Sequence, residues 1–256
     1  MRLDIYLHEK DIFNSREKAR RAVLEGAVSV NGNIILKPAY EIGDFDDIQI
    51  VKETNPYVGR GGIKLKAALE YFNVDLSGVT ALDVGASTGG FTDCMLKNGA
   101  VAVYACDVGS NQLDVTLKND SRVVNLENTD IRNVAVSPEK YGIGAGIKFE
   151  FVTVDVSFIS LTKVLPAVKM LLQPEGKVLC LIKPQFEFGD IELASSRKFF
   201  KNGIIKDPSI HKKVCGKISG FAQGIGYKVL GIIDSPVTGG SGNKEFLMML
   251  ESATLN

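Results

Sequence analysis

The chain has 256 residues, 45% of them hydrophobic and 23% charged, an ordinary composition for a globular protein of one large domain or of a medium and a small one. Its 30 basic and 30 acidic residues cancel, so the net charge neither supports nor excludes a nucleic-acid partner. No run reaches the ~20 apolar positions of a membrane helix, and MRLDIYLHEKD lacks the apolar core of a signal peptide. With two histidines and four scattered cysteines a zinc site is not expected either, and we predict an intracellular protein without metal.

The first predicted unit spans residues 1–54 and combines two short helices with a small sheet. Apolar residues within Arg2–Lys10 are spaced as in a short amphipathic helix, and Ser15 is a good N-cap for a second helix that Gly26 ends. Asn31-Gly32 separates two alternating runs, which is a strong signal for a β-hairpin, and IQIV predicts a further strand. This unit is therefore expected to be a small α+β domain.

Residues 55–58 form a predicted linker, because the residue before Pro56 avoids helical conformation and the proline interrupts a strand. In residues 59–256, nearly continuous Val/Leu/Ile strands alternate with helices, which predicts an α/β domain with a doubly wound, Rossmann-like parallel sheet. The expected strands are 80–85, 101–109, 122–127, 149–156 and 177–183, followed by an antiparallel pair at 227–237 and 245–252. The expected helices are 61–72, one beginning at Gly90, 111–118, 161–172 and 208–223.

A glycine-rich turn follows the first of these strands, where ALDV runs directly into GASTGGF and a helix. In open α/β sheets, ligands bind at the carboxyl ends of strands, where a helix N-terminus faces them. The glycines permit a close approach to a ligand, although a close helix–strand contact would use them equally well. The spacing D-x-G-x-x-x-G-G differs from the G-x-G-x-x-G of dinucleotide sites, and Asp107 ends the next strand, where a carboxylate can bind two ribose hydroxyls. We therefore expect an adenosyl ligand without a pyrophosphate.

Four charged residues lie at or near the predicted ligand edge of this sheet. Asp155 and Lys183 end neighbouring strands, Lys64 lies in the helix before the first strand, and Glu245 begins the last strand. A surface lysine, an edge-strand charge and a helix cap are the structural alternatives for Lys64, Glu245 and Asp155. Lys183 is different, because a cation that ends the buried strand VLCLI is costly unless it is partnered.

The first unit resembles the S4 RNA-binding fold in RLD, NSREKARRAVLEGAVSVNG and KPAY. The resemblance implies that the helix after the Ser-Arg pair and the following hairpin contact structured RNA. It nominates as phosphate or sugar contacts Ser15, Arg16, Lys18, Arg20 and Arg21. From the residues alone, this helix face would more often be a solvated charged surface.

The stretches DVGASTGGFT and ACDVG resemble the S-adenosylmethionine-binding loops of Rossmann-like methyltransferases, which implies that cofactor. The implied cofactor-binding residues are Asp83, Gly85, Ala86, Ser87, Thr88, Gly89, Gly90, Phe91, Asp107 and Asp130. Asp130 lies where that family contacts adenine, and it could instead cap the next helix. Together with SREKA, YVGRGGIKLKAAL, DVSFISL, LIKPQFE and GNKEF, these stretches resemble the TlyA (haemolysin A-like) family, in which an S4 domain is joined to an FtsJ-like methyltransferase domain.

The resemblance also assigns roles, because Lys64, Asp155, Lys183 and Glu245 match the K-D-K-E tetrad of 2′-O-ribose methyltransferases. It implies methyl transfer to a ribose 2′-hydroxyl, with cytidine in ribosomal RNA as the expected target. A lysine acts as a base only when its pKa falls from ~10.4 toward neutrality, which burial and a second cation promote. Lys183 is thereby the expected base, Lys64 the second cation that positions ribose or phosphate, and Asp155 and Glu245 their respective partners.

The segment after KPQFE departs from the family pattern, because GDIELASSRKFFKNGIIKDP is longer and more aromatic. Its Arg197 and Lys198 are further RNA-binding candidates, as is Arg60 of YVGRGG, although this loop could equally pack on its own phenylalanines. Ribosomal RNA and ribosomal subunits are the expected partners, in the cytoplasm. Two alternatives stay open: a membrane-active haemolysin, and an RNA-binding protein without catalytic activity.

Overall fold

The computed structural model describes residues 1–13, 15–24, 26–51, 55–144, 146–187, 200–201, 204–239 and 242–253. The chain divides into two compact units, an N-terminal unit of Met1–Pro56 and a C-terminal unit of Tyr57–Asn256. The N-terminal unit has one buried apolar cluster and the C-terminal unit has two, so each unit can be described by itself.

The N-terminal unit packs two helices on a three-stranded antiparallel sheet of order β2-β1-β3. Its elements are α1 (Leu3–Glu9), α2 (Arg16–Leu24), β1 (Val28–Val30), β2 (Asn33–Ile34) and β3 (Ile48–Ile50). The hairpin turn between β1 and β2 forms because Asn31 and Gly32 both adopt positive φ, at 51° and 76°. Leu3, Leu7 and Val23 fill the space between helices and sheet, with no exposed surface.

The C-terminal unit is built on a seven-stranded sheet of order β11-β12-β8-β7-β4-β5-β6. Its strands are β4 (Thr80–Val84), β5 (Ala102–Cys106), β6 (Val123–Leu126), β7 (Phe149–Val154), β8 (Leu172–Ile182), β11 (Tyr227–Asp234) and β12 (Phe246–Ser252). The five strands from β8 to β6 are parallel, whereas β12 runs antiparallel to both β8 and β11. The predicted fold class is confirmed, with the antiparallel pair at one edge of the sheet.

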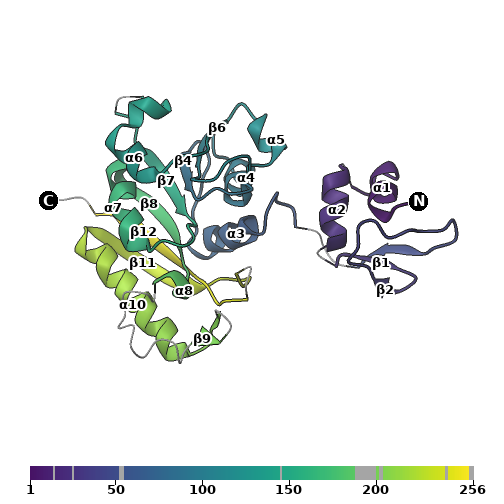
Figure 1. The fold of residues 1–256 in the computed structure, drawn as a ribbon. Coiled ribbons are helices and arrows are strands. Elements are labelled where there is room, and N and C mark those ends of the chain that lie inside the picture. Colours follow the sequence, from purple (N-terminus) through teal and green to yellow (C-terminus); the bar gives the residue numbers. More distant parts are fainter. Residues whose placement is uncertain are drawn as a thin grey trace. The chain divides into compact units, whose positions relative to one another are not determined.

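Helices cover both faces of this sheet (Figure 1). They are α3 (Gly61–Tyr71), α4 (Gly90–Lys97), α5 (Val115–Lys118), α6 (Ile131–Val136), α7 (Leu161–Leu171) and α10 (Pro208–Gly224). Two apolar clusters lie on opposite faces of the sheet, because consecutive strand residues point in opposite directions. Ala81 packs with α3 and α4, and the next residue, Leu82, packs with α6 and α7. The parallel strands are thus buried on both sides, and their carboxyl ends share one edge.

Several elements differ from the sequence-based expectation. The expected helix 111–118 is reduced to α5, and β8 begins at Leu172 rather than at residue 177. The elements that were not predicted are α6, a 3-10 turn at Pro138–Tyr141, the short helix α8 (Pro184–Glu187), and the antiparallel pair β9 (Phe200–Lys201) and β10 (Ile204–Ile205). α5 begins only after Asp114, because Asp114 has φ of −57° and ψ of 141° and caps the helix by accepting from Thr116 N at 2.9 Å. Before the cap, Asn111 has a positive φ of 55°, and Glu127 accepts hydrogen bonds from the backbone N–H groups of Gln112 and Leu113 at 3.0 and 3.3 Å.

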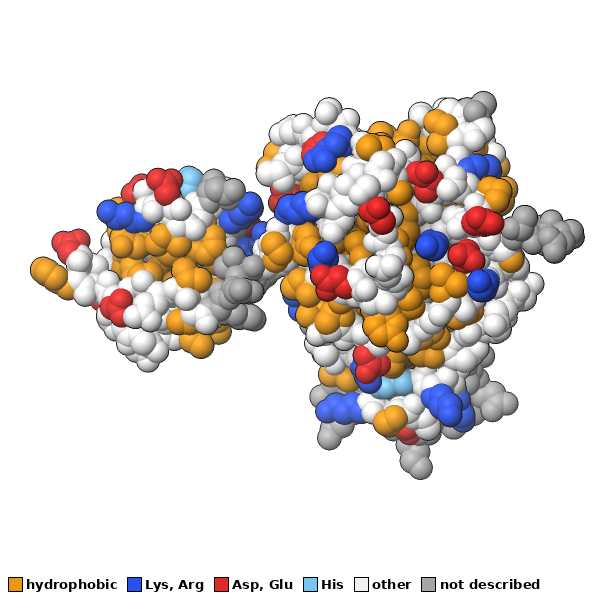
Figure 2. Space-filling view, turned by 180° about the vertical axis from the view of Figure 1, so that it is seen from behind, with side chains coloured by type: hydrophobic (Ala, Val, Ile, Leu, Met, Phe, Trp, Pro, Cys, Tyr) orange, Lys and Arg blue, Asp and Glu red, His pale blue; other side chains and the backbone are white. Residues whose placement is uncertain are grey.

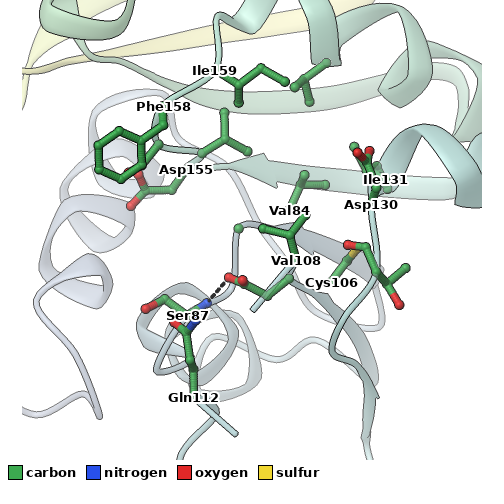
Figure 3. A pocket seen from close by; sticks show the side chains of 16 residues that line it. Val84, Ser87, Cys106, Val108, Gln112, Asp130, Ile131, Asp155, Phe158 and Ile159 are labelled. Carbon is green, nitrogen blue, oxygen red and sulfur yellow. Dashed lines mark hydrogen bonds between the residues drawn. The ribbon is translucent and has the colours of Figure 1, made fainter. Parts of the chain in front are cut away.

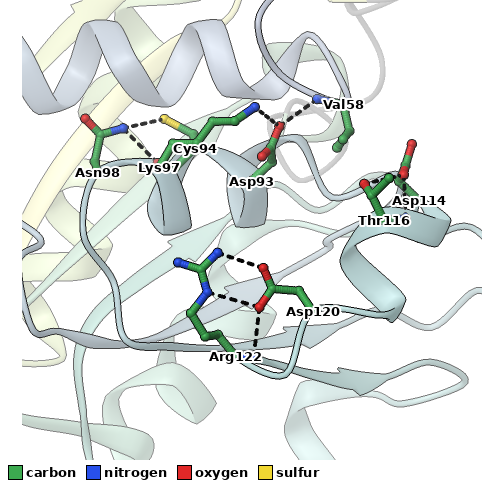
Figure 4. A network of polar contacts seen from close by, with 9 residues as sticks. All are labelled: Val58, Asp93, Cys94, Lys97, Asn98, Asp114, Thr116, Asp120 and Arg122. Atoms are coloured by element: carbon green, nitrogen blue, oxygen red, sulfur yellow. Dashed lines mark hydrogen bonds and ion pairs between the residues drawn. The ribbon is translucent and has the colours of Figure 1, made fainter. Parts of the chain in front are cut away.

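A polar network fixes the segment that leads into α3 (Figure 4). Asp93 of α4 accepts hydrogen bonds from the Val58 backbone N–H at 2.9 Å and from Lys97 Nζ at 2.8 Å. The YVGRGG segment and α4 are held together in this way, and α3 and α4 lie in contact on one face of the sheet.

Candidate active site and RNA interface

A cavity of about 320 Å³ opens at the carboxyl ends of β4, β5 and β7 (Figure 3). Its size falls in the usual range for small-ligand sites, and apolar side chains line it beside a few polar groups. Of the ten residues predicted to bind a cofactor, the cavity is lined by Gly85, Ser87, Asp107 and Asp130. Asp155, predicted as a catalytic residue, lines the same cavity.

The other two glycines of the glycine-rich turn, Gly89 and Gly90, lie outside the cavity lining. A Cβ on Gly90 would lie 3.0 Å from Gly59 O, and a Cβ on Gly89 would lie 2.3 Å from a Leu117 methyl carbon. Gly89 and Gly90 therefore allow α4 to approach its neighbours, which is the structural alternative that the sequence left open for these glycines. Ala86, Thr88 and Phe91 also lie outside the cavity lining.

Gly85 is the glycine that faces the cavity, and its conformation requires glycine. Its φ is +85°, and a Cβ would lie 2.5 Å from the backbone oxygen of Asp155. The glycine-rich turn and the loop after β7 are therefore in direct backbone contact, which places the predicted cofactor residues next to a predicted catalytic one.

Asp83 lies beneath the turn and does not line the cavity. Its carboxylate is fully buried and accepts hydrogen bonds from Thr92 N (3.0 Å), Thr92 Oγ1 (2.7 Å) and Thr153 Oγ1 (2.8 Å). Burial raises the pKa of this carboxyl to about 6, although these hydrogen bonds act in the opposite direction. Asp83 thus ties α4 and β7 to the turn.

Asp107 and Asp130 both line the cavity, and their carboxylates have different hydrogen-bond partners. The Asp107 carboxylate accepts hydrogen bonds from Ser87 N at 2.8 Å and Gly109 N at 2.7 Å, which fixes it at the cavity wall. Asp130 caps α6 by accepting from the Arg132 backbone N–H at 2.9 Å, and the Arg132 guanidinium lowers the pKa of the Asp130 carboxyl. The helix-cap alternative for Asp130 is therefore realised, in a residue that also faces the cavity.

Sequence reasoning missed several cavity residues that lie on loops. Gln112 is carried by the loop after β5, which Glu127 holds in place. Burial acts to raise the pKa of the Glu127 carboxyl. Hydrogen bonds from backbone N–H groups of this loop and the charge of Lys118 outweigh this effect and lower the pKa to about 2. Phe158 is 91% exposed at the cavity rim, has φ of +63° and lies with its ring centroid 4.9 Å from that of Phe186. Positive φ in a bulky residue is rare, and its presence in DVSFISL could not be read from the sequence.

The predicted base Lys183 is buried at the cavity edge and has two polar partners, a carboxylate and a hydroxyl. Lys183 Nζ lies 2.6 Å from Asp155 Oδ1 and donates to Ser157 Oγ at 2.9 Å. Asp155 and Ser157 both line the cavity, so the amine lies beside it. The lysine at the end of the buried strand therefore has partners for its charge, as expected, and Ser157 is a partner that the sequence did not indicate.

The second predicted pair, Lys64 and Glu245, is also in contact. Lys64 Nζ donates to Glu245 Oε2 at 2.7 Å, and the two side chains are only 9% and 4% exposed. In the sheet, Ile182 is paired with Phe246, and the next residues along the two antiparallel strands are Lys183 and Glu245. All four tetrad residues therefore meet at one edge of the sheet, as two ion pairs side by side.

In the N-terminal unit, the predicted RNA-binding residues lie on and around the first turns of α2. Ser15 caps this helix, since its Oγ accepts from Lys18 N at 3.2 Å. Arg16 contacts the buried Asp4 at 3.2 Å, and Asp4 also binds Arg2, at 2.9 Å, so Arg2 joins the candidate interface although it was not predicted. Arg20 pairs with Glu17 at 3.3 Å.

The other candidates are less informative. Lys18 and Arg21 are half-buried on α2. Arg60 is exposed at the start of α3. Arg197 and Lys198 lie outside the described residues, as does the loop alternative that concerned them. Within the described ranges there is no cluster of three His, Cys, Asp or Glu residues placed to hold a metal ion.

Comparison with known proteins supplies the family. The FtsJ-like methyltransferase family matches residues 57–252, and the S4 domain family matches residues 1–48. Hemolysin A of Brachyspira hyodysenteriae is 40% identical over 96% of this chain and 98% of its own length. The 16S/23S rRNA (cytidine-2'-O)-methyltransferase TlyA of Mycobacterium tuberculosis is 36% identical over 99% of this chain and 90% of its own length.

A solved structure from Streptococcus thermophilus, whose name includes the word hemolysin, is 41% identical. It covers 99% of this chain and 88% of its own chain, with a TM-score of 0.74. The family resemblance inferred from the motifs is confirmed by these matches. The chain belongs to the FtsJ-like methyltransferase family and, within it, to the TlyA proteins that carry an N-terminal S4 domain.

Proposed function

We propose that the protein transfers a methyl group from S-adenosylmethionine to the ribose 2′-hydroxyl of a cytidine in ribosomal RNA. The observation that carries the proposal is the buried Lys183 amine, held by Asp155 and Ser157 at the edge of the cavity. A TlyA relative is named for this reaction, and the cytidine target and the ribosomal RNA are inferred from that name.

The cavity residues suit an adenosyl cofactor. Asp107 offers carboxylate oxygens at the end of β5, where a ribose diol can donate to them, and Val84, Ile131 and Ile159 offer apolar surface to a flat ring. A Cβ on Gly85 would lie 2.5 Å from Asp155 O, so glycine at this position lets the turn and the loop after β7 approach each other at the cavity wall. When bound, S-adenosylmethionine supplies an electrophilic methyl group on a sulfonium centre.

Lys183 is placed to take the proton from the ribose hydroxyl. A neutral lysine amine has two N–H bonds and one lone pair. One N–H bond is donated to Ser157 Oγ, and the nitrogen lies 2.6 Å from Asp155 Oδ1. The lone pair is then directed toward the remaining open side, where the 2′-hydroxyl would be bound. The ribose oxygen would bond to the methyl carbon as the bond between that carbon and the sulfonium sulfur breaks, with S-adenosylhomocysteine as the leaving group. The hydroxyl proton would pass to Lys183, and the ammonium formed would keep both protein partners.

Lys64 and Glu245 support this step from the neighbouring strand end. Their ion pair is almost completely buried, so removal of either partner would leave an uncompensated charge, which costs about 3–5 kcal/mol. We propose that Lys64 also attracts the ribose or an adjacent phosphate, while Glu245 fixes its position.

The N-terminal unit would bind the RNA. Arg2 and Arg16 share Asp4, and their exposed guanidinium groups can bind phosphates bidentately. We propose the functional division as residues 1–54 for RNA binding, 55–58 as linker and 59–256 for catalysis. Ribosomal subunits are the proposed partners, in the cytoplasm, and DNA is excluded as a substrate because it lacks the 2′-hydroxyl.

The test is methyl transfer into ribosomal subunits taken from cells that lack the protein. The unmodified protein and Lys140→Ala, which changes an exposed lysine of the 3-10 turn, should transfer equally well. Lys183→Ala should lose 10²- to 10⁴-fold in kcat, the usual contribution of a general base. Lysis of erythrocytes is measured on the same preparations, because one relative is named Hemolysin A. Lysis without methyl transfer would overturn the proposal, and so would full transfer by Lys183→Ala.

A further inference from the structure

The lysines of helix α10 are not at positions where they would stabilise the helix. Its sequence, PSIHKKVCGKISGFAQG, contains three lysines and no acidic residue over 17 positions. Lysines on a surface helix are normally balanced by acids three or four positions away, and cations are favoured in the last turn. Here no acidic residue lies at those spacings, and no lysine is in the last turn.

Three of the lysines in and just before this helix form an exposed group, which we call the α10 lysine face: Lys206, Lys212 and Lys213. None of them forms an ion pair with any acid of the part of the chain that is described. Asp207, an acid next to Lys206 in the sequence, is engaged as the helix cap and accepts from Ser209 N at 2.8 Å. In a chain whose charges balance, this is a local excess of positive charge.

Helix α10, which carries the α10 lysine face, packs against residues that follow two tetrad residues in the chain. His211 of α10 has its ring 5.4 Å from that of Phe246, the residue that follows Glu245. On the next turn, Lys217 donates to the backbone oxygen of Glu187 at 3.2 Å, in the short helix that follows Lys183. Figure 2 shows basic side chains on both sides of the histidine at the lower end of the C-terminal unit.

We infer that the α10 lysine face binds the phosphate backbone of the RNA that flanks the target nucleotide. This inference rests on the proposed function and adds a second RNA-binding surface, on the catalytic unit itself. Lysines act on phosphates as point charges without sequence preference, so the face would hold the RNA next to the active site while the tetrad acts on one nucleotide. An anionic lipid surface would offer the same charge, and the RNA is favoured because the face adjoins the proposed ribose-binding edge.

The experiment compares Lys212→Ala/Lys213→Ala with Lys140→Ala in the full chain, binding to isolated 23S and 16S rRNA over a series of salt concentrations. Each phosphate contact contributes about 0.9 to the slope of log K against log salt. The double variant should lower that slope by about 2 and weaken binding roughly 10- to 30-fold at 0.15 M salt. The KM for ribosomal subunits should rise correspondingly, while kcat and the affinity for S-adenosylmethionine stay within twofold of the unmodified protein.

The outcomes separate the two proposals. An unchanged salt slope and KM in the double variant would overturn the α10 lysine face and leave the proposed function standing. Absence of methyl transfer in the unmodified protein would overturn the proposed function, whereas the slope would still report on RNA binding. Vesicles of phosphatidylserine and phosphatidylcholine serve as the second probe, and lysine-dependent binding to vesicles but not to RNA would also overturn the inference.

Discussion

Gly85→Ala tests whether the backbone contact between the glycine-rich turn and Asp155 organises the site. Gly85 has φ of +85°, a region that costs alanine about 1 kcal/mol. The added methyl group would lie 2.5 Å from Asp155 O and 2.9 Å from Asp155 C, which are backbone atoms that cannot rotate away. Overpacking of this kind costs about 1–3 kcal/mol. We therefore expect a total loss of about 2–4 kcal/mol in the free energy of unfolding.

Two control variants separate the contributions. Gly142 has φ of +73° with nothing within 4 Å of an added Cβ, so Gly142→Ala should cost only the conformational term of about 1 kcal/mol. Gly220 lies in α10 with open space around it, and Gly220→Ala should stabilise the protein by about 0.5–1 kcal/mol. The difference between the variants at 85 and 142 isolates the clash with Asp155.

The assay is urea unfolding of the three variants, with calorimetry of S-adenosylmethionine binding in parallel. Displacement of Asp155 by the methyl group should weaken cofactor binding at least about tenfold in Gly85→Ala, since about 1.4 kcal/mol of the clash energy would suffice. If Gly85→Ala costs no more than Gly142→Ala and binds the cofactor normally, the turn and Asp155 are not coupled, and the reasoning is refuted.

Two further predictions concern buried carboxylates behind the site. Burial raises the pKa of Asp83 from 3.8 to about 6, so its contribution to stability is present below pH 3.8 and is lost as pH rises through 6. Asp83→Asn does not titrate, so its stability relative to the unmodified protein should improve by about 2–3 kcal/mol between pH 4 and pH 8 in urea unfolding, and a difference independent of pH would contradict this. Glu187 accepts from Ser160 Oγ at 2.5 Å and Leu161 N at 2.8 Å, holding the end of the loop that carries Asp155. Glu187→Ala should cost about 2–3 kcal/mol of stability and lower kcat, with Glu187→Gln intermediate, and unchanged kcat in both would remove this role.

Much of the fold follows from local patterns in the sequence. The Val/Leu/Ile runs of β4, β7 and β8 predict buried parallel strands because both faces of each strand must be apolar. The order of these strands then places Asp155 and Lys183 at one edge, and a buried cation needs a partner, so their ion pair was foreseeable. The hairpin at Asn31-Gly32 was equally foreseeable, since both residues tolerate positive φ.

The remainder depends on contacts between residues far apart in the chain. A carboxylate at a strand end can face the ligand or the core, and Asp83 faces the core because Thr92 and Thr153 are there to donate to it. The loop before α5 is held by Glu127, which lies beyond the next strand in the sequence. The exposed position and positive φ of Phe158 are set by the loop between β7 and α7, for which no local rule exists.

The location of the transferred methyl group tests the central claim most directly. Ribosomal subunits from cells that lack the protein are treated with the purified protein and S-adenosylmethionine, digested to nucleosides and analysed by mass spectrometry. The account predicts that 2′-O-methylcytidine appears with the unmodified protein and falls at least 10²-fold with Lys183→Ala, whose amine contacts Asp155 and Ser157. A methyl group on a base, or 2′-O-methylation that persists without Lys183, would contradict it.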